Sequence, residues 1–246
     1  MSPTAYKPMT YKPSDVVAYH GELAGDWEPR YQKRSFRARL AVLEECLAGR
    51  SLAGTQWLDA GCGTGTLTRY LAAQGCSVTG LDAAPNMIQI ARSEARLHPR
   101  ADHMSFDVTA TIEDLPQATA SLDGVLCSSV LEYVPSVEQC LAGFARVLKP
   151  GGLLLASVPN SRSIVRRAQV AVHGLGNSLG RNWLEFMKYS RNEYSGLEFE
   201  RLLRAHDFNV KKIVVFGSPI PRSVQRQPWG GSLLMFLAVR NGSLAR

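Results

Sequence analysis

The fold of this chain is decided by the stretch Trp57-Leu58-Asp59-Ala60-Gly61-Cys62-Gly63-Thr64-Gly65-Thr66. Its apolar start is typical of a buried strand, and the segment from Thr66 onward has the spacing of a helix. Three alternating glycines stand between the two. Glycine adopts positive φ and lets backbone N–H groups approach a ligand that a Cβ atom would block. The stretch therefore predicts a strand, a ligand-binding turn and a helix.

The glycine spacing differs from that of the common dinucleotide-binding turn. That turn has glycines at the first, third and sixth positions after a strand. The sixth position is Thr66 when counted from Gly61, and Thr68 when counted from Gly63. Because both counts fail, we do not expect NAD or a related dinucleotide as the ligand.

A second predicted strand, Val78–Leu81, ends at the acidic residue Asp82. A helix-length segment separates it from Gly65, so the two strands form a βαβ unit. In nucleotide-binding folds, an acid about 20 residues after the glycines binds the ribose hydroxyls. We expect this role for Asp82; the simpler alternative is that it only caps the helix that begins at Pro85.

Strands and helices alternate along the rest of the chain, as in a doubly wound α/β fold. Apolar spacing over residues 19–47 predicts two N-terminal helices. The expected strands are 57–59, 78–81, 104–108, 122–128, 153–158, 210–216 and 232–239, and the expected helices are 66–74, 85–97, 137–148 and, after the capping box Ser195-Gly196-Leu197-Glu198, 195–206. This order predicts a Rossmann-like, mostly parallel seven-stranded sheet with an antiparallel C-terminal strand.

Composition excludes several classes of protein. The 246 residues are 45% hydrophobic and 20% charged, with no apolar run near the roughly 18 residues of a membrane span. Residues 1–14 lack an apolar signal core, so we expect a cytoplasmic protein. The five cysteines have no Cys-x-x-Cys pair, which favours reduced thiols over zinc or disulfides, and no metal site is expected.

The motif Asp59-x-Gly61-x-Gly63-x-Gly65 resembles the first motif of the class I S-adenosylmethionine-dependent methyltransferases. Residues 122–127, 128–134 and 146–152 resemble that family's fourth-strand motif, its "LEHV" segment and its post-helix turn. The layout is most similar to the small-molecule group that includes the ubiquinone-biosynthesis O-methyltransferases. Two positions depart from the family pattern: Tyr133 stands where "LEHV" has His, and Thr111 stands where an acid is common.

The resemblance implies S-adenosylmethionine as cofactor, with S-adenosylhomocysteine as product. It places the methionine part on Asp59 and the glycine loop, the ribose on Asp82, the sulfonium near Ser128 and the cofactor carboxylate on Arg37, with Arg34 and Arg39 as alternatives. Ile112 or Asp107 would recognise the adenine, and Ala83 and Met87 would flank the adenine ring. The full cofactor-binding set is Asp59, Gly61, Cys62, Gly63, Gly65, Asp82, Ala83, Met87, Ile112, Ser128 and Arg37.

Methyl transfer from a sulfonium mainly requires alignment of donor and acceptor, but an oxygen or nitrogen acceptor must still lose a proton. Glu132, Tyr133 and His20 are the catalytic candidates, and His173 is a further one. Each has a purely structural or surface alternative. Trp27 and Tyr31 either close over the site or, as we favour, pack the N-terminal helices together.

The resemblance divides the single domain into N-terminal helices (1–50), a cofactor-binding core (51–159), a cap segment (160–194) and a C-terminal helix with antiparallel strands (195–246). The cap segment is basic: six Lys or Arg residues stand against Glu185 in residues 160–192. One predicted helical face is apolar (Ile164, Ala168, Ala171, Leu175) and another is polar (Arg162, Arg166, His173). Three alternatives follow: solvated arginines on a packed helix, contact with an acidic acceptor, or contact of residues 161–191 with an anionic membrane.

We therefore expect a methyltransferase that acts on O or N of a small aromatic or lipid-linked acceptor. The basic C-terminal half favours one alternative, an RNA methyltransferase. Against nucleic acid as partner, Cys127-Ser128-Ser129 stands where amino-methylating nucleic-acid enzymes have an Asn/Asp-Pro-Pro-aromatic turn. A non-catalytic regulatory protein that binds the cofactor is the other alternative.

Overall fold

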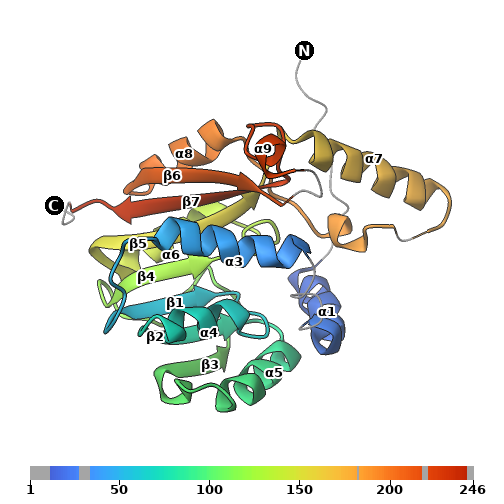
Figure 1. Cartoon of the computed structure of the whole chain (residues 1–246). Coiled ribbons are helices and arrows are strands. Elements are labelled where there is room, and N and C mark those ends of the chain that lie inside the picture. The colour runs from blue at the N-terminus through green and yellow to red at the C-terminus, as the bar shows by residue number, and fades with distance from the viewer. Residues whose placement is uncertain (1–11, 28–33, 182, 218–220, 243–246) are drawn as a thin grey trace.

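The computed structural model describes residues 12–27, 34–181, 183–217 and 221–242. Its seven-stranded sheet has the order β3-β2-β1-β4-β5-β7-β6 (Figure 1). Strands β1 to β5 pair in parallel, and β7 is antiparallel to both of its neighbours. The strands are β1 Gln56–Ala60, β2 Ser77–Asp82, β3 Met104–Val108, β4 Leu122–Cys127, β5 Leu148–Pro159, β6 Phe208–Phe216 and β7 Leu233–Arg240. The predicted fold class is confirmed.

Helices cover both faces of the sheet. Those described are α1 Pro13–Leu23, α3 Arg34–Leu47, α4 Thr66–Ala73, α5 Pro85–Arg96, α6 Val137–Val147, α7 Ile164–Ser178, α8 Gly196–Ala205 and α9 Arg222–Gln225, with 3₁₀ turns η1 Ala24–Asp26, η2 Ala101–His103 and η3 Glu185–Lys188. Helices α3 and α4 bury Leu43 and Leu71 with Trp57 on one face, while α6 and α8 bury Phe144 and Phe199 on the other. Burial on both faces explains why consecutive residues, Trp57-Leu58 in β1 and Val125-Leu126-Cys127 in β4, are apolar instead of alternating with polar ones.

Most element boundaries differ from the predicted ones by at most two residues, and two differ by more. Helix α1 begins at Pro13, before the predicted region, because Pro13 occupies a first-turn position and the Lys12 N–H donates to the Asp15 carboxylate at 2.9 Å. Strand β5 begins at Leu148 because Leu148 pairs with Leu122 before the register shifts and pairing resumes at Leu153. The glycines ahead of Leu153 therefore belong to an irregular strand start.

The cap segment lies with α1 beyond the end of the sheet where β1 and β4 terminate (Figure 1). Its helix α7 is amphipathic, and the apolar face that the sequence indicated is the exposed one. Ile164 and Leu175 are 52% and 56% exposed, whereas Arg166 and His173 are each 5% exposed. The polar face is buried because the segment beneath it supplies partners: His173 Nδ1, for example, donates to the Trp183 carbonyl at 2.9 Å. Burial of polar side chains follows such partners, and an apolar pattern alone does not reveal them.

Candidate functional site

A cavity of about 660 Å³ opens at the carboxyl ends of the parallel strands. The glycine turn after β1 and the loops after β2 and β4 form its floor, and α1, Trp27 and the cap segment cover it. Ligands in open α/β sheets bind at this end of the strands, where the strand order reverses between β1 and β4.

The glycine turn and Asp82 form one side of the cavity. One Asp82 carboxylate oxygen accepts a hydrogen bond from the Gly63 N–H and the other from the Ala84 N–H, both at 2.9 Å. Gly63 has φ of +54°, in the left-handed region that favours glycine. Burial raises the pKa of Asp82 above its usual value, and the two backbone bonds oppose that rise. Asp82 thus fixes the turn and borders the space beside it.

Most residues predicted for the cofactor line this cavity. They are Gly61, Cys62, Gly63, Asp82, Ala83, Met87, Ile112 and Ser128. Trp27 lines it as well, with its Nε1 atom 3.5 Å from where a Gly63 Cβ would lie, so this aromatic residue covers the glycine turn. Tyr31, the other aromatic residue considered as a cover, lies outside the described residues.

Three predicted cofactor residues lie elsewhere: among the described residues, Asp59, Gly65 and Arg37 are absent from the cavity wall. Gly65 is the N-cap of α4, packed against Phe106. The Arg37 side chain is exposed, and Arg39, two positions on, lines the cavity instead. A helix turns about 100° per residue, so a two-residue difference changes which face an arginine occupies.

Asp59 is buried within the core, at 2% exposure. Its carboxylate accepts a hydrogen bond from Thr68 Oγ1 at 2.7 Å, which links β1 to α4. Burial raises the pKa of Asp59 to about 7, and the neighbouring Asp82 charge adds to that rise. The observed contacts of Asp59 are structural ones. Asp107, considered for adenine recognition, is instead exposed and paired with Arg92, and it too is absent from the cavity wall.

We expect Asp59 to make folding less favourable as pH rises from 6 to 8. An unfolded Asp titrates near 3.9, so between about pH 4 and 7 the folded state holds a proton that the unfolded state has lost. The unfolding free energy attributable to Asp59 should then fall by about 1.4 kcal/mol between pH 6 and pH 8. Urea unfolding at both pH values measures it in the wild type and in Asp59→Asn, which keeps the acceptor for Thr68. An identical pH dependence in the two proteins would contradict the assignment.

Arg39 and a group of serines border the cavity between β4 and β5. Arg39 Nε donates to Ser129 Oγ at 3.0 Å, and the Ser129 N–H donates to Ser157 Oγ at 2.7 Å. Ser129 has φ of +63°, an unusual conformation for a residue other than glycine. Ser128 Oγ lies 3.3 Å from the same Ser157 hydroxyl. This network holds the turn after β4 in one conformation.

Aromatic side chains form the half of the cavity nearest α1 and the cap segment, where Tyr19, His20, Tyr133 and Phe186 line the wall. His20 packs edge-on against Tyr133 with ring centroids 5.0 Å apart. Its Nδ1 atom lies 2.9 Å from the Val16 carbonyl, which can only accept, so Nδ1 carries the proton. The Nε2 atom of neutral His20 is then a proton acceptor. Burial raises the pKa of Tyr133 well above its usual value, so this residue stays a neutral phenol.

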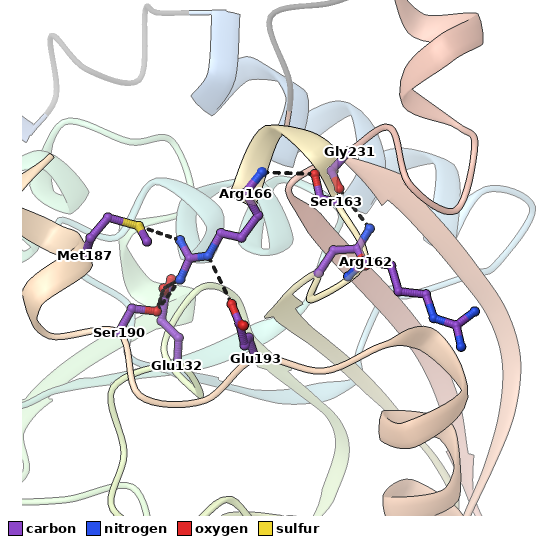
Figure 2. A network of polar contacts seen from close by, with 9 residues as sticks. Glu132, Arg162, Ser163, Arg166, Met187, Ser190, Glu193 and Gly231 are labelled. Carbon is purple, nitrogen blue, oxygen red and sulfur yellow. Dashed lines mark hydrogen bonds and ion pairs between the residues drawn. The ribbon is translucent and has the colours of Figure 1, made fainter. Parts of the chain in front are cut away.

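Glu132 is part of a buried polar cluster that joins the β4 turn to the cap segment (Figure 2). Its carboxylate accepts a hydrogen bond from Ser190 Oγ at 2.7 Å and lies 3.7 Å from Arg166 Nη2. The side chains of Glu132 and Arg166 are 7% and 6% exposed, and both residues line the cavity. His173, the remaining catalytic candidate, is absent from the cavity wall formed by the described residues.

Within the described ranges, no group of three or more His, Cys, Asp or Glu side chains has the arrangement of a metal site. No helix of the described part of the chain is both long and apolar enough to cross a membrane. All five cysteines are buried and free.

Residues 58–156 match the family described as "Methyltransferase domain". Residues 58–156 are thus a methyltransferase domain, and the strand order of the sheet is typical of the class I S-adenosylmethionine-dependent methyltransferase fold. It is 34% identical over 153 residues to a ubiquinone biosynthesis O-methyltransferase of Xylella fastidiosa, with 61% of each protein covered. The same enzyme of Xanthomonas oryzae is 38% identical over 137 residues, 54% of this chain and 56% of that protein. The alignments thus span less than two thirds of these relatives.

Solved structures share the fold across nearly the whole chain. The magnesium protoporphyrin IX methyltransferase of Synechocystis, solved with S-adenosylhomocysteine, superposes with a TM-score of 0.69 over 94% of this chain and all of its own, at 18% identity. A possible histamine N-methyltransferase of Thermotoga maritima superposes with a TM-score of 0.68 over 91% of this chain and 99% of its own, at 20% identity. These likenesses extend the fold to the N-terminal helices and the cap segment.

Proposed function

We propose that this protein transfers a methyl group from S-adenosylmethionine to an oxygen atom of a small aromatic acceptor. One observation carries the proposal: the Asp82–Gly63 turn and the His20–Tyr133 aromatic pair line the same cavity, on different sides of it. The similarity to O-methyltransferases supports oxygen rather than nitrogen as the acceptor atom.

The cofactor would lie with its ribose on Asp82 and its methionine part along the Gly61–Gly63 turn, beneath Trp27. Arg39, the arginine of α3 that lines the cavity, would bind its carboxylate. When bound, S-adenosylmethionine supplies a methyl group on a positively charged sulfur that leaves as a neutral thioether. Exclusion of water by the enclosing helices favours this loss of charge.

In this proposal, His20 accepts the proton that the acceptor hydroxyl must lose. Its Nε2 lone pair is available because Nδ1 is held as donor to Val16, and imidazole is a suitable base near neutral pH. Glu132 is less suited to this role because Ser190 and Arg166 engage its carboxylate. Tyr133 stays protonated and orients the acceptor ring beside His20.

The test of this proposal uses S-adenosylmethionine with a radiolabelled methyl group and a panel of small phenols and catechols. We expect label in at least one product, with kcat reduced about 10²-fold in His20→Gln, within the range of general-base catalysis. Wild-type affinity for S-adenosylhomocysteine should be retained. Cofactor binding without transfer to any acceptor, including small molecules from a cell extract, would instead support the regulatory alternative.

A second proposed role, contact with an anionic membrane, rests on the exposed face of α7. Val172 and Leu175 of α7 are 43% and 56% exposed, and Leu179, directly after the helix, is 59% exposed. The exposed basic residues Arg167 and Arg181 border this face. Exposed apolar side chains beside cations match the two components of binding to anionic lipid, which would bring a lipid-dissolved acceptor near the cavity.

We expect replacement of Leu175 and Leu179 by serine to reduce co-sedimentation with phosphatidylglycerol vesicles several-fold. Arg167→Gln should weaken binding less, and its effect should shrink as salt screens the charge. Leu97→Ser is the matched control, since Leu97 is 83% exposed at the end of α5. Equal sedimentation of the double variant, the control and the wild type would refute membrane contact and leave α7 with solvated arginines.

A further inference from the structure

Arg166 is a buried cation whose hydrogen-bonding capacity exceeds the partners it has. A guanidinium group carries five N–H donors in a planar fork. Nη2 donates to Ser190 Oγ, Nε lies 3.5 Å from a Glu193 carboxylate oxygen, and Nη1 lies 3.0 Å from the Met187 sulfur (Figure 2). Within the described residues, the fork makes no other hydrogen bond or ion pair apart from the 3.7 Å approach to Glu132.

These contacts leave one edge of the fork without a strong acceptor. A thioether is a weak hydrogen-bond acceptor, and neither carboxylate makes the two parallel bonds that arginine forms with its preferred partners. Glu193 is also 44% exposed, so water screens its charge. A buried charge is costly unless hydrogen bonds satisfy it, so the Nη1 edge has a strong tendency to bind an oxygen.

Arg166 also borders the acceptor half of the cavity. Arg166 lines the wall together with Phe186 of the cap segment and Tyr133 of the β4 turn. Arg39 borders the same cavity, so its wall carries two cations, Arg39 and Arg166, besides the carboxylates of Asp82, Glu113 and Glu132. Arg162, four positions before Arg166, is exposed, and its side chain points away from the cluster (Figure 2).

We infer that Arg166 selects acceptors that carry a carboxylate. The guanidinium would bind a carboxylate oxygen of the acceptor in place of the Met187 sulfur, while the aromatic ring of the acceptor packs among Tyr133, Phe186 and Tyr19. This inference rests on the proposed function, because it assigns the acceptor of that same cavity. It also separates the arginines of the cap segment: Arg166 acts inside the site, and the exposed arginines do not.

The test compares 4-hydroxybenzoate with 4-hydroxybenzamide, which have similar shapes and differ in charge. Calorimetry on protein saturated with S-adenosylhomocysteine should show the acid binding at least tenfold more tightly than the amide. Arg166→Met should reduce this preference to less than threefold. Arg162→Met, the matched control on the exposed side, should retain it.

A second variant separates recognition from folding. Arg166→Met leaves Glu132 buried without its cation, so we include Glu132→Gln/Arg166→Met, which removes both charges of the pair. It should fold, bind S-adenosylhomocysteine and lack the preference for the acid. Failure of the wild type to bind S-adenosylhomocysteine would overturn the proposed function itself. With that ligand bound, equal affinity for acid and amide, binding of neither, or a preference that survives in the double variant would overturn the role of Arg166 alone.

Discussion

Replacement of Gly63 by valine is expected to lower the affinity for S-adenosylhomocysteine at least 100-fold in a protein that still folds. Gly63 has φ of +54° and lines the cavity, so a branched side chain there is strained and extends into the space meant for the ligand. A strained conformation of this kind costs about 1–3 kcal/mol before any clash with ligand is counted. The nearest protein atom to the new Cβ is Trp27 Nε1 at 3.5 Å, an ordinary contact, so the unliganded protein accommodates it.

Gly61 provides the matched control for this experiment. A Cβ at Gly61 would lie 2.2 Å from a Val130 methyl group, so Gly61→Ala should lower the unfolding free energy, whereas Gly63→Val should leave the far-UV circular dichroism near that of the wild type. The two variants thus separate the loss of protein packing at Gly61 from the loss of ligand space at Gly63. Unchanged calorimetric affinity in a folded Gly63→Val protein would show that the cofactor does not lie along this turn.

Replacement of Asp82 by alanine should weaken S-adenosylhomocysteine binding by about 1.5–3 kcal/mol, or about 10- to 150-fold, the effect of losing a hydrogen bond to a charged group. The expected loss lies near the upper end of this range. Asp82 also accepts hydrogen bonds from the Gly63 and Ala84 N–H groups. Its removal therefore makes the glycine turn less rigid, and the ligand binds to that turn in its fixed conformation. Isothermal titration of both proteins measures the change.

Asp107→Ala is the control for Asp82→Ala. Asp107 lies on β3, which pairs with β2, but its carboxylate is exposed and bound to Arg92 outside the cavity wall. Its replacement should change the affinity by less than twofold. Equal affinity of the Asp82 and Asp107 variants would limit Asp82 to the structural capping role that the sequence also allowed.

The sequence was most informative where function and local geometry depend on the same residues. The turn at Gly61 and Gly63 needs residues without a Cβ, and the acid after β2 must stand at a strand end, so spacing alone located both. The strands of the core follow from continuous apolar runs, since burial on both faces leaves no other pattern. These local requirements account for the close agreement over residues 56–159.

The sequence was least informative where long-range packing decides the position of a side chain. The sequence does not show which of several arginines in α3 faces the cavity; the bond from Arg39 to Ser129 spans 90 residues. The sequence left open whether the polar face of α7 is solvated, because the partners of Arg166, among them Glu132, come from distant parts of the chain. Asp59 was assigned to the ligand by its motif, yet its carboxylate is engaged by Thr68 in the core.

The measurement that tests the central claim most directly is a calorimetric titration of the wild-type protein with S-adenosylhomocysteine and, separately, with NAD. The Gly61–Gly63 turn and Asp82 predict saturable binding of one S-adenosylhomocysteine per chain in the micromolar range and no heat with NAD. Binding of NAD without any response to S-adenosylhomocysteine would contradict the account.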